Sequence, residues 1–350
     1  MGILFRCVLC GNAIRSLDNQ LHCESCEKEY LFNEGVYLFS QSNHYYSDLD
    51  KERMEALIKS SRNDGWKKTV KRKFANNPFL FKIITDETRA DWQYMLPLNS
   101  ESVALDIGAG WGTISIPLAR NIKHVVALDG TVDRLQFLSL RASQEKIENI
   151  SIVHADIFQH PFQMEQFDLI SFNGVLEWVG VGNEDINPAE KQLEALKIAY
   201  SLLKPGGYLY IGIENALGLK YLLGEPDDHT GVKYISYLDR DTASELNQQY
   251  NNMNYSTYTY SKNGYQDLLE SAGYLDVQYY YPHPDYKRIE SLHSLDDRNV
   301  SCFVTESLRY THSNHSIHER VNDLEKALIE YGELDPFPAS YSIIARKEVG

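Results

Sequence analysis

This sequence lacks the segments that would place a protein in a membrane or outside the cell. None of its 350 residues lies in an apolar run approaching the roughly 18 residues of a membrane-spanning helix. The first residues, MGILFRCVLCG, become polar and contain cysteine too early for a secretory signal peptide. No internal repeat and no low-complexity tract is evident. We therefore expect a globular protein of the cytoplasm.

The sequence is also poor in positive charge. It has 34 Lys and Arg against 49 Asp and Glu, a formal net charge of −15. Its average surface would repel RNA or DNA, so nucleic acid is not the expected partner and could bind only through a local basic patch. Residues 51–82 could form such a patch, because they hold ten Lys/Arg and three Asp/Glu, which leaves −22 for the rest of the chain. We interpret this segment as a solvated helical face that balances charge; the alternative is a contact for RNA or for a phosphate-bearing substrate.

Cysteine is nearly absent after residue 26, where only Cys302 remains. The other four cysteines form two C-x-x-C pairs, Cys7 with Cys10 and Cys23 with Cys26. Two such turns can close a tetrahedron around one structural Zn²⁺ with no open position. Two disulfides are the alternative, which a cytoplasmic setting disfavours. We predict a zinc ribbon over residues 1–40, with short strands at residues 3–5 and 30–32.

Residues 41–100 are predicted to be a basic helical connector. After a polar stretch at 41–50, apolar residues recur at helical spacing through residues 54–74, which indicates helices with one buried face. A further helical stretch at 86–96 ends at Pro97, which cannot continue a helix.

From residue 102 short β-branched runs alternate with helical segments, which is typical of a parallel sheet with crossover helices. The first strand, 103–107, leads into a glycine loop that contains Gly108, Gly110 and Gly112, with Asp106 two residues before it. Glycines there allow the backbone to approach a ligand closely. A dinucleotide dehydrogenase is the alternative, but its loop would have the spacing G-x-G-x-x-G.

Polar side chains fall at the ends of the following strands. Asp129 ends the strand at 125–129, where a carboxylate can accept both hydroxyls of a ribose. In the next strand region Asp156 could take an adenine amino group, while Ile157 packs on its ring. Asn173 ends the fourth strand, 167–173, and a helix end, a Pro-Gly-Gly turn and a fifth strand follow at 202–211.

Taken together, residues 102–215 resemble the class I S-adenosylmethionine-dependent methyltransferases. The resemblance implies an α/β fold with a Rossmann-like seven-stranded sheet and helices on both faces. It also implies that the loop 108–112 lies under the methionine part of the cofactor, that Asp129 binds the ribose and that Asp156 contacts the adenine. The loop 173–178 would face the methyl group.

The acceptor-side residues are predicted from two polar clusters. Residues 214–231 are punctuated by glycine and proline and contain His229, the candidate general base, with Asp228 as the residue that orients it. Residues 279–287 form a second cluster, expected just after a strand, which presents His283. For each of these residues, a loop position without a chemical role is the alternative. We expect residues 216–262 to cover the site as a lid.

These two clusters also resemble methyltransferase-like domains of bacterial cell-surface polysaccharide and lipopolysaccharide biosynthesis, over residues 100–290. That resemblance implies a nucleotide-sugar or glycan acceptor. The Asn/Asp-Pro-Pro-aromatic signature of many N-methyltransferases is absent after the fourth strand, so we favour O-methylation of a small-molecule or carbohydrate-linked acceptor.

The predicted methyltransferase domain spans residues 101–350 and ends with the strand 340–346. Residues 287–338 are predicted to be an insertion before that strand, helical at 317–333, for contacts with substrate or with a second copy in a homodimer. Two other functions remain open. One is an rRNA or tRNA methyltransferase that uses the zinc ribbon and the basic connector; the other is a non-catalytic interaction protein whose ribbon docks partners.

Overall fold

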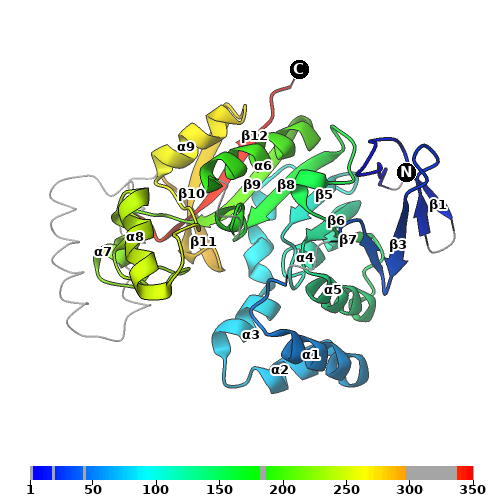
Figure 1. Cartoon of the computed structure of the whole chain (residues 1–350), viewed down its shortest axis with the longest axis horizontal. Helices are drawn as coiled ribbons and strands as arrows, with labels where there is room; N and C mark the ends of the chain where they lie inside the picture. The colour runs from blue at the N-terminus through cyan, green and yellow to red at the C-terminus, as the bar shows by residue number, and fades with distance from the viewer. Residues whose placement is uncertain (1–2, 18–19, 42–44, 182–186, 297–336, 350) are drawn as a thin grey trace. The chain divides into compact units, whose positions relative to one another are not determined.

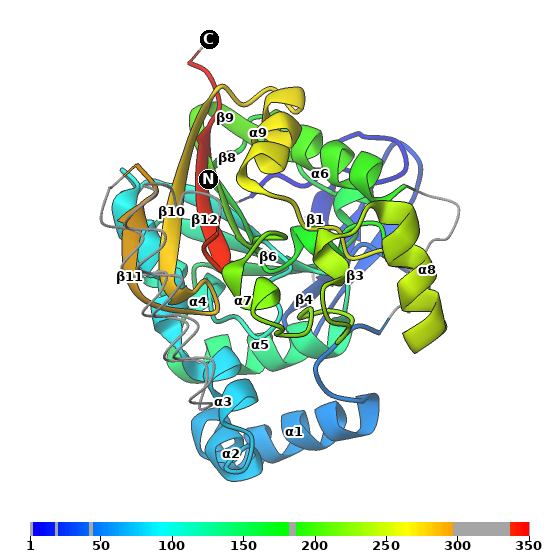
Figure 2. The same ribbon diagram turned by 90° about the vertical axis from the view of Figure 1, so that its left-hand side faces the viewer.

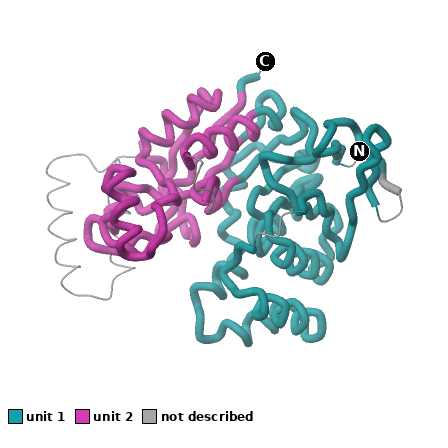
Figure 3. The backbone as a smooth tube through the Cα atoms, viewed as in Figure 1, with its two compact units in different colours: residues 1–171, 201–208, 348–350 teal, residues 172–200, 209–347 magenta. Residues whose placement is uncertain are grey.

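The computed structural model describes residues 3–17, 20–41, 45–181, 187–296 and 337–349. The chain divides into two compact units, one formed by residues 1–171, 201–208 and 348–350 and the other by residues 172–200 and 209–347 (Figure 3). Cys302, the predicted helix 317–333 and most of the predicted insertion lie outside the described residues. The predicted boundaries of ribbon, connector and methyltransferase domain stay predictions.

The first unit is built around a β-sheet in which a ribbon adjoins a parallel core. Its strands follow the spatial order β1 (Arg15–Leu17), β2 (Gln20–His22), β3 (Glu29–Asn33), β4 (Val36–Leu38), β7 (Ile150–His154), β6 (His124–Asp129), β5 (Val103–Ile107) and β8 (Phe167–Asn173). The pairs β5–β6 and β6–β7 are parallel, as the alternating pattern predicts. The crossover helices are α4 (Ser115–Asn121) and α5 (Val132–Glu145), and a short 3-10 helix, η2 (Ile157–Gln159), follows β7 (Figure 1).

The expected Rossmann-like fold is confirmed, but the count of seven strands is wrong. The ribbon strands extend the sheet, because β4 pairs in parallel with β7 and places Val36 opposite Ile152. The predicted strand at residues 3–5 is also wrong, since Phe5 makes only an isolated bridge with Phe162. The strand predicted at 30–32 is confirmed as part of β3.

The helices predicted over residues 54–74 are present, and they belong to the core of the first unit. The connector consists of α1 (Lys51–Asp64), α2 (Trp66–Lys73), α3 (Pro78–Thr85) and the 3-10 helix η1 (Glu87–Met95). Asp50 caps α1, and Gly65, with φ of 87°, lets the chain turn between α1 and α2. The apolar faces of α1, α2 and α3 pack in one cluster with Trp111 and Phe137. Burial of this face holds the connector against the glycine loop and α5.

The second unit has its own four strands, in the order β9 (Leu203–Glu214), β12 (Ser340–Arg346), β10 (Asp276–Asp285) and β11 (Arg288–Ser294). Residues 203–208 of β9 belong to the first unit. The predicted terminal strand is confirmed as β12, which runs antiparallel beside β10 (Figure 2). The prediction that residues 279–287 form a loop after a strand is wrong. Residues 279–285 lie within β10, since the alternating Tyr279 and Tyr281 bury their rings on one face.

The second unit also contains α-helices and 3-10 helices between its strands. They are η3 (Leu176–Trp178), α6 (Pro188–Leu202), α7 (Leu219–Leu222), η4 (Ile235–Tyr237), α8 (Arg240–Asn251) and α9 (Lys262–Ser271). The last two residues of α6 belong to the first unit. The helix expected at 263–273 is confirmed as α9. Within the described part of the chain, no helix is long and apolar enough to cross a membrane.

Candidate cofactor site, cysteine site and buried polar cluster

The glycine loop of the first unit follows β5 and leads toward α4. The backbone amides of Gly108 and Ala109 both donate to the carbonyl of Leu128, at 2.8 and 3.0 Å, which ties the loop to β6. Gly110 and Gly112 have positive φ values of 48° and 77°. A Cβ atom would lie 2.3 Å from the Arg134 guanidinium at Gly110 and 2.2 Å from Leu138 at Gly112. The positive φ values favour glycine at both positions, and the close packing against Leu138 adds to this at Gly112.

Asp106 is buried at the end of β5 and fixes the surroundings of the loop. Its carboxylate accepts hydrogen bonds from the hydroxyls of Ser115, at 2.5 Å, and Ser171, at 2.8 Å. Burial raises the pKa of Asp106 to about 6, although the two serine hydrogen bonds oppose the shift. Because the side chain is 2% exposed and its known partners are protein hydroxyls, Asp106 acts here as a positioning residue. Its predicted contact with the cofactor stays a prediction.

The other predicted cofactor residues lie at strand ends, with different exposure. Asp129 accepts from the amides of Gly110, at 2.9 Å, and Thr131, at 2.8 Å, so the ribose-binding candidate also shapes the glycine loop. Asp156 is exposed and Ile157 is buried, an arrangement that suits a polar contact at one edge of an adenine and an apolar contact on its face. The two carboxylate acceptors and the apolar side chain fit the nucleoside of S-adenosylmethionine.

Asn173 falls in the second unit, at the end of β8. It is 9% exposed, and its amide oxygen and nitrogen have no hydrogen-bond partner among the described residues. A Cβ atom at Gly212 would lie 2.2 Å from the amide oxygen of Asn173, so only glycine fits there. A buried amide without partners is costly, which is consistent with a ligand as its missing partner. Its role in binding the cofactor stays a prediction.

The sequence did not reveal how closely the connector adjoins the glycine loop. The indole Nε1 of Trp111 donates to Asp48 at 2.8 Å, and the Thr113 hydroxyl donates to the carbonyl of Ile83 at 2.8 Å. Arg141, fully buried on α5, donates to the carbonyls of Trp111 and Ile84. The connector is therefore a support for the cofactor loop.

Three connector arginines already form ion pairs. Arg53, Arg62 and Arg72 lie 3.2, 2.7 and 2.8 Å from carboxylates of Asp50, Glu34 and Asp64. These pairs are exposed, so each contributes little to stability. They nevertheless reduce the positive charge that residues 51–82 could offer to a phosphate group.

The four early cysteines converge on one point. Their sulfurs lie within 4.8 Å of one another, with Cys7 3.5 Å from Cys26 and Cys10 3.4 Å from Cys23. None of the four forms a disulfide. Burial raises the pKa of the Cys7 thiol, but hydrogen bonds with Tyr30 and with backbone amides outweigh it and lower the pKa to about 6. Four thiol groups at this spacing fit tetrahedral Zn²⁺, whose ligands at about 2.3 Å would be about 3.8 Å apart.

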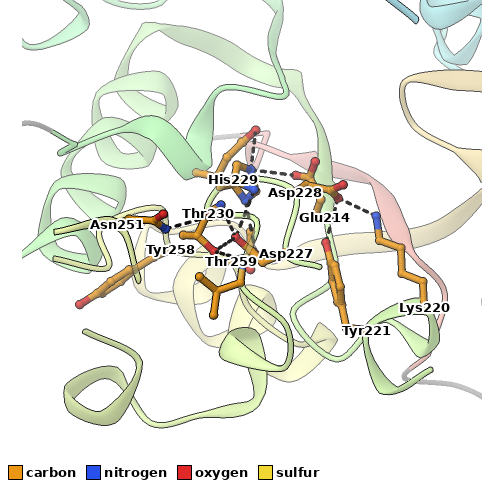
Figure 4. A network of polar contacts seen from close by, with 12 residues as sticks. Glu214, Lys220, Tyr221, Asp227, Asp228, His229, Thr230, Asn251, Tyr258 and Thr259 are labelled. Carbon is orange, nitrogen blue, oxygen red and sulfur yellow. Dashed lines mark hydrogen bonds and ion pairs between the residues drawn. The ribbon is translucent and has the colours of Figure 1, made fainter. Parts of the chain in front are cut away.

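A buried polar cluster occupies the second unit, with His229 at its centre (Figure 4). Its Nε2 lies 3.9 Å from Glu177 and 3.8 Å from Glu214, while Nδ1 lies 3.7 Å from Asp227. Burial lowers the pKa of His229, but the three carboxylates outweigh it and raise the pKa to about 10. The ring of Trp178 packs edge-on against the imidazole at 5.1 Å between centroids. A protonated imidazole cannot accept a proton, so the predicted base role of His229 stays a prediction.

The aspartate beside the His229 imidazole is Asp227, although Asp228 was predicted to orient it. Asp228 accepts instead from Lys220, at 2.6 Å, and from the hydroxyl of Tyr221, at 2.9 Å. The reversal follows from the turn at 227–231, in which Asp227 folds back to accept from the amide and hydroxyl of Thr230, both at 2.8 Å. Burial opposes ionisation of Asp228, but Lys287 and Lys220 outweigh it and hold its pKa well below the usual range.

His283 lies in β10 with a different set of neighbours. Its Nδ1 is 3.3 Å from the hydroxyl of Tyr281, and its ring packs edge-on against that of His293 at 6.5 Å. It is 8% exposed. Its predicted catalytic role stays a prediction.

Sequence reasoning did not single out Glu177, Glu214 or Lys287 as functional residues. Glu177 lies in η3 and Glu214 ends β9, and both are about 1% exposed. Lys287 and the hydroxyl of Tyr286 both donate to Oε1 of Glu214, the latter at 3.0 Å. Glu214 could have been found, because it is an acidic residue at the end of an apolar strand. Acidic side chains are rarely buried unless they are paired, so such a position indicates a functional group.

Comparison with known proteins agrees with this geometry. The family model for a methyltransferase domain matches residues 98–273, just over half of the chain, and the chain belongs to that family. The glycine loop and the strand-end acids Asp129 and Asp156 lie within the matched residues.

Curated relatives act on different acceptors. The 23S rRNA (uracil(1939)-C(5))-methyltransferase RlmD of Haemophilus parainfluenzae is 32% identical over 90 residues, which are 26% of this chain and 20% of that protein. The release factor glutamine methyltransferase of Shewanella oneidensis is 26% identical over 181 residues, 44% of this chain and 62% of that protein. The malonyl-[acyl-carrier protein] O-methyltransferase of a Marinomonas strain is 34% identical over 117 residues, 33% of this chain and 39% of that protein. The chain spans less than two thirds of each of these relatives.

Solved structures match this chain at low sequence identity and with TM-scores below 0.5. Phosphoethanolamine N-methyltransferase 2 of Haemonchus contortus, in complex with S-adenosylmethionine, is 15% identical with a TM-score of 0.44, covering 83% of this chain and 60% of that one. The YcgJ protein of Bacillus subtilis is 12% identical with a TM-score of 0.42, covering 76% of this chain and all of that one.

Proposed function

We propose that this methyltransferase transfers the methyl group of S-adenosylmethionine to a hydroxyl of a small-molecule or carbohydrate-linked acceptor. The observation that supports the proposal is the buried polar cluster of the second unit. Its carboxylates can accept hydrogen bonds from hydroxyl groups, and they would repel the phosphates of RNA. In the chain, Glu177 lies in the loop that the family resemblance assigns to the methyl group, and Glu214 ends the following strand.

The reaction requires little covalent chemistry from the protein. The acceptor hydroxyl loses its proton, its oxygen bonds to the methyl carbon, and the bond from that carbon to sulfur breaks to leave a neutral thioether. Since the sulfonium is already an activated leaving group, the enzyme aligns the two reactants and handles the proton. His229, Asp228 and His283 remain the predicted residues for that proton.

The test is transfer of labelled methyl from S-adenosylmethionine to a native cell extract that is then fractionated into RNA, protein and small molecules. We expect label in the small-molecule or glycan fraction, in an alkali-stable ether linkage. Asp129→Ala is the inactive control, and calorimetry should show that it loses cofactor binding. Label that enters only RNA would support the RNA methyltransferase alternative and contradict the proposal. Label in no fraction would support the non-catalytic alternative.

We also propose that the four early cysteines hold one structural Zn²⁺. The support is their common approach within 4.8 Å without any disulfide. Metal analysis of the purified chain should find one tightly held zinc, which Cys10→Ser removes. Cys302→Ser is the matched control and should retain it. Retention of full zinc by Cys10→Ser would contradict the assignment.

A further inference from the structure

We propose that Glu177, Glu214 and His229 form a second metal site, for a divalent first-row ion such as Mn²⁺ or Zn²⁺. One nitrogen and two carboxylate oxygens of these side chains lie within 4.8 Å of one another. The donors come from η3, the end of β9 and the loop 223–234, so three separate segments meet at one point. A neutral imidazole with two carboxylates suits divalent ions of this class, and the ion would displace the proton of Nε2 when it binds.

The spacing of the three groups is too wide for hydrogen bonds and suits a shared ion. Nε2 of His229 is 3.9 Å from Oε1 of Glu177 and 3.8 Å from Oε2 of Glu214. An N–H···O hydrogen bond spans only about 2.7–3.2 Å. Two ligand atoms that are each about 2.1 Å from one ion are about 3.4 Å apart at a tetrahedral angle and at most about 4.2 Å apart. Both pairs therefore fall within reach of a single metal ion.

The two carboxylates leave buried oxygens without hydrogen-bond donors. Among the described residues, neither Oε2 of Glu177 nor Oε2 of Glu214 has a hydrogen-bond partner, and their side chains are 2% and 1% exposed. A buried charged oxygen without a partner is strongly unfavourable. A cation bound between these oxygens would supply the missing interaction.

Neighbouring residues lie where the partners of a metal site are found. Asp227 stands 3.7 Å from Nδ1 of His229, beyond hydrogen-bond distance, and Thr230 fixes its carboxylate (Figure 4). With an ion bound at Nε2, a small shift of the ring would let Nδ1 donate to this carboxylate, which then sets the tautomer of the imidazole. Lys287 and Tyr286 hold Oε1 of Glu214, which leaves Oε2 for the ion.

Charge around the site also favours a cation. Five carboxyl groups gather here, namely those of Glu177, Glu214, Asp227, Asp228 and Asp285. Among the residues that the structure describes, Lys220 and Lys287 form ion pairs with these carboxylates, beside His229. The ion's part in catalysis rests on the proposed function: a divalent cation beside an acceptor hydroxyl would favour loss of its proton to water.

The experiment is a titration with Mn²⁺ of the full-length protein loaded with one equivalent of zinc, which the cysteine site takes first; free Mn²⁺ is followed by its electron paramagnetic resonance signal. Thiolates prefer softer ions, so the cysteine site does not compete for manganese. We expect one Mn²⁺ per chain. Glu177→Gln and His229→Ala should each weaken binding at least tenfold, and Asp227→Asn should weaken it about 10- to 100-fold.

Glu245→Gln is the matched control, because it removes an exposed carboxylate from α8 of the same unit and should leave binding unchanged. Calorimetric binding of S-adenosylmethionine by each variant shows that the chain is still folded. Absence of Mn²⁺ binding by the wild-type chain, or equal binding by a folded Glu177→Gln variant, overturns the proposal. This readout needs no methyl acceptor, so its failure is distinct from failure of the proposed function.

Discussion

Replacement of Asp106 by asparagine should raise the free energy of unfolding above that of the wild type at alkaline pH. At acid pH the replacement should give no such gain. Burial raises the pKa of this carboxyl to about 6, against the ordinary value of 3.8 that it has in the unfolded chain. Between these values the native state binds a proton that the unfolded chain does not, so stability falls as pH rises through this window. The difference of about 2 pH units corresponds to about 3 kcal/mol above pH 7.

Asparagine carries no charge, and its amide can still accept from one serine and donate to the other. We therefore expect Asp106→Asn to gain about 1–3 kcal/mol over the wild type at pH 8, after loss of one charge-assisted hydrogen bond, and to show no such gain at pH 4. Denaturant unfolding of both proteins at the two pH values measures the difference. An equal stability difference at both pH values would refute the protonation of Asp106 in the native state.

Two further predictions concern the first unit. Gly112→Ala should lower the free energy of unfolding by about 1–3 kcal/mol and weaken binding of S-adenosylmethionine, because its Cβ would meet Leu138 and its φ is positive. Gly130→Ala is the control, because a Cβ there meets open space. Equal shifts in melting temperature for the two variants would contradict the packing argument. Burial and the nearby Arg6 lower the pKa of His160 to about 4, so stability should be lost as pH falls from about 6.5 to about 4. His160→Asn should remove up to about 3 kcal/mol of that loss, and an unchanged acid slope in denaturant unfolding would count against it.

The glycine loop could be predicted because each of its signals is local. A strand, three glycines and a strand-end acid lie within a few residues of one another, and backbone sterics decide what such a run can form. The two C-x-x-C pairs are similar, since each pair is one short turn. The connector helices were also predictable from apolar spacing, but their support of Trp111 was not, because Asp48 meets that indole only through the folded chain.

The buried polar cluster shows what local reasoning misses. Asp227 and Asp228 are adjacent in sequence and equally polar, yet the turn closed by Thr230 aims Asp227 at His229 and leaves Asp228 to Lys220. Likewise, residues 279–285 contain two prolines and suggested a loop, whereas pairing with β12 and β11 holds them in a strand. In each case the deciding contact comes from a distant segment.

By itself, therefore, the sequence determined the fold class, the methyltransferase family and the thiols that meet at the ribbon. Their signals are short-range and follow from backbone geometry and side-chain type. Only the tertiary structure decided which carboxylates surround His229. Glu177, Glu214 and Asp227 come from separate segments, and burial together is what gives their charges a large effect on one another.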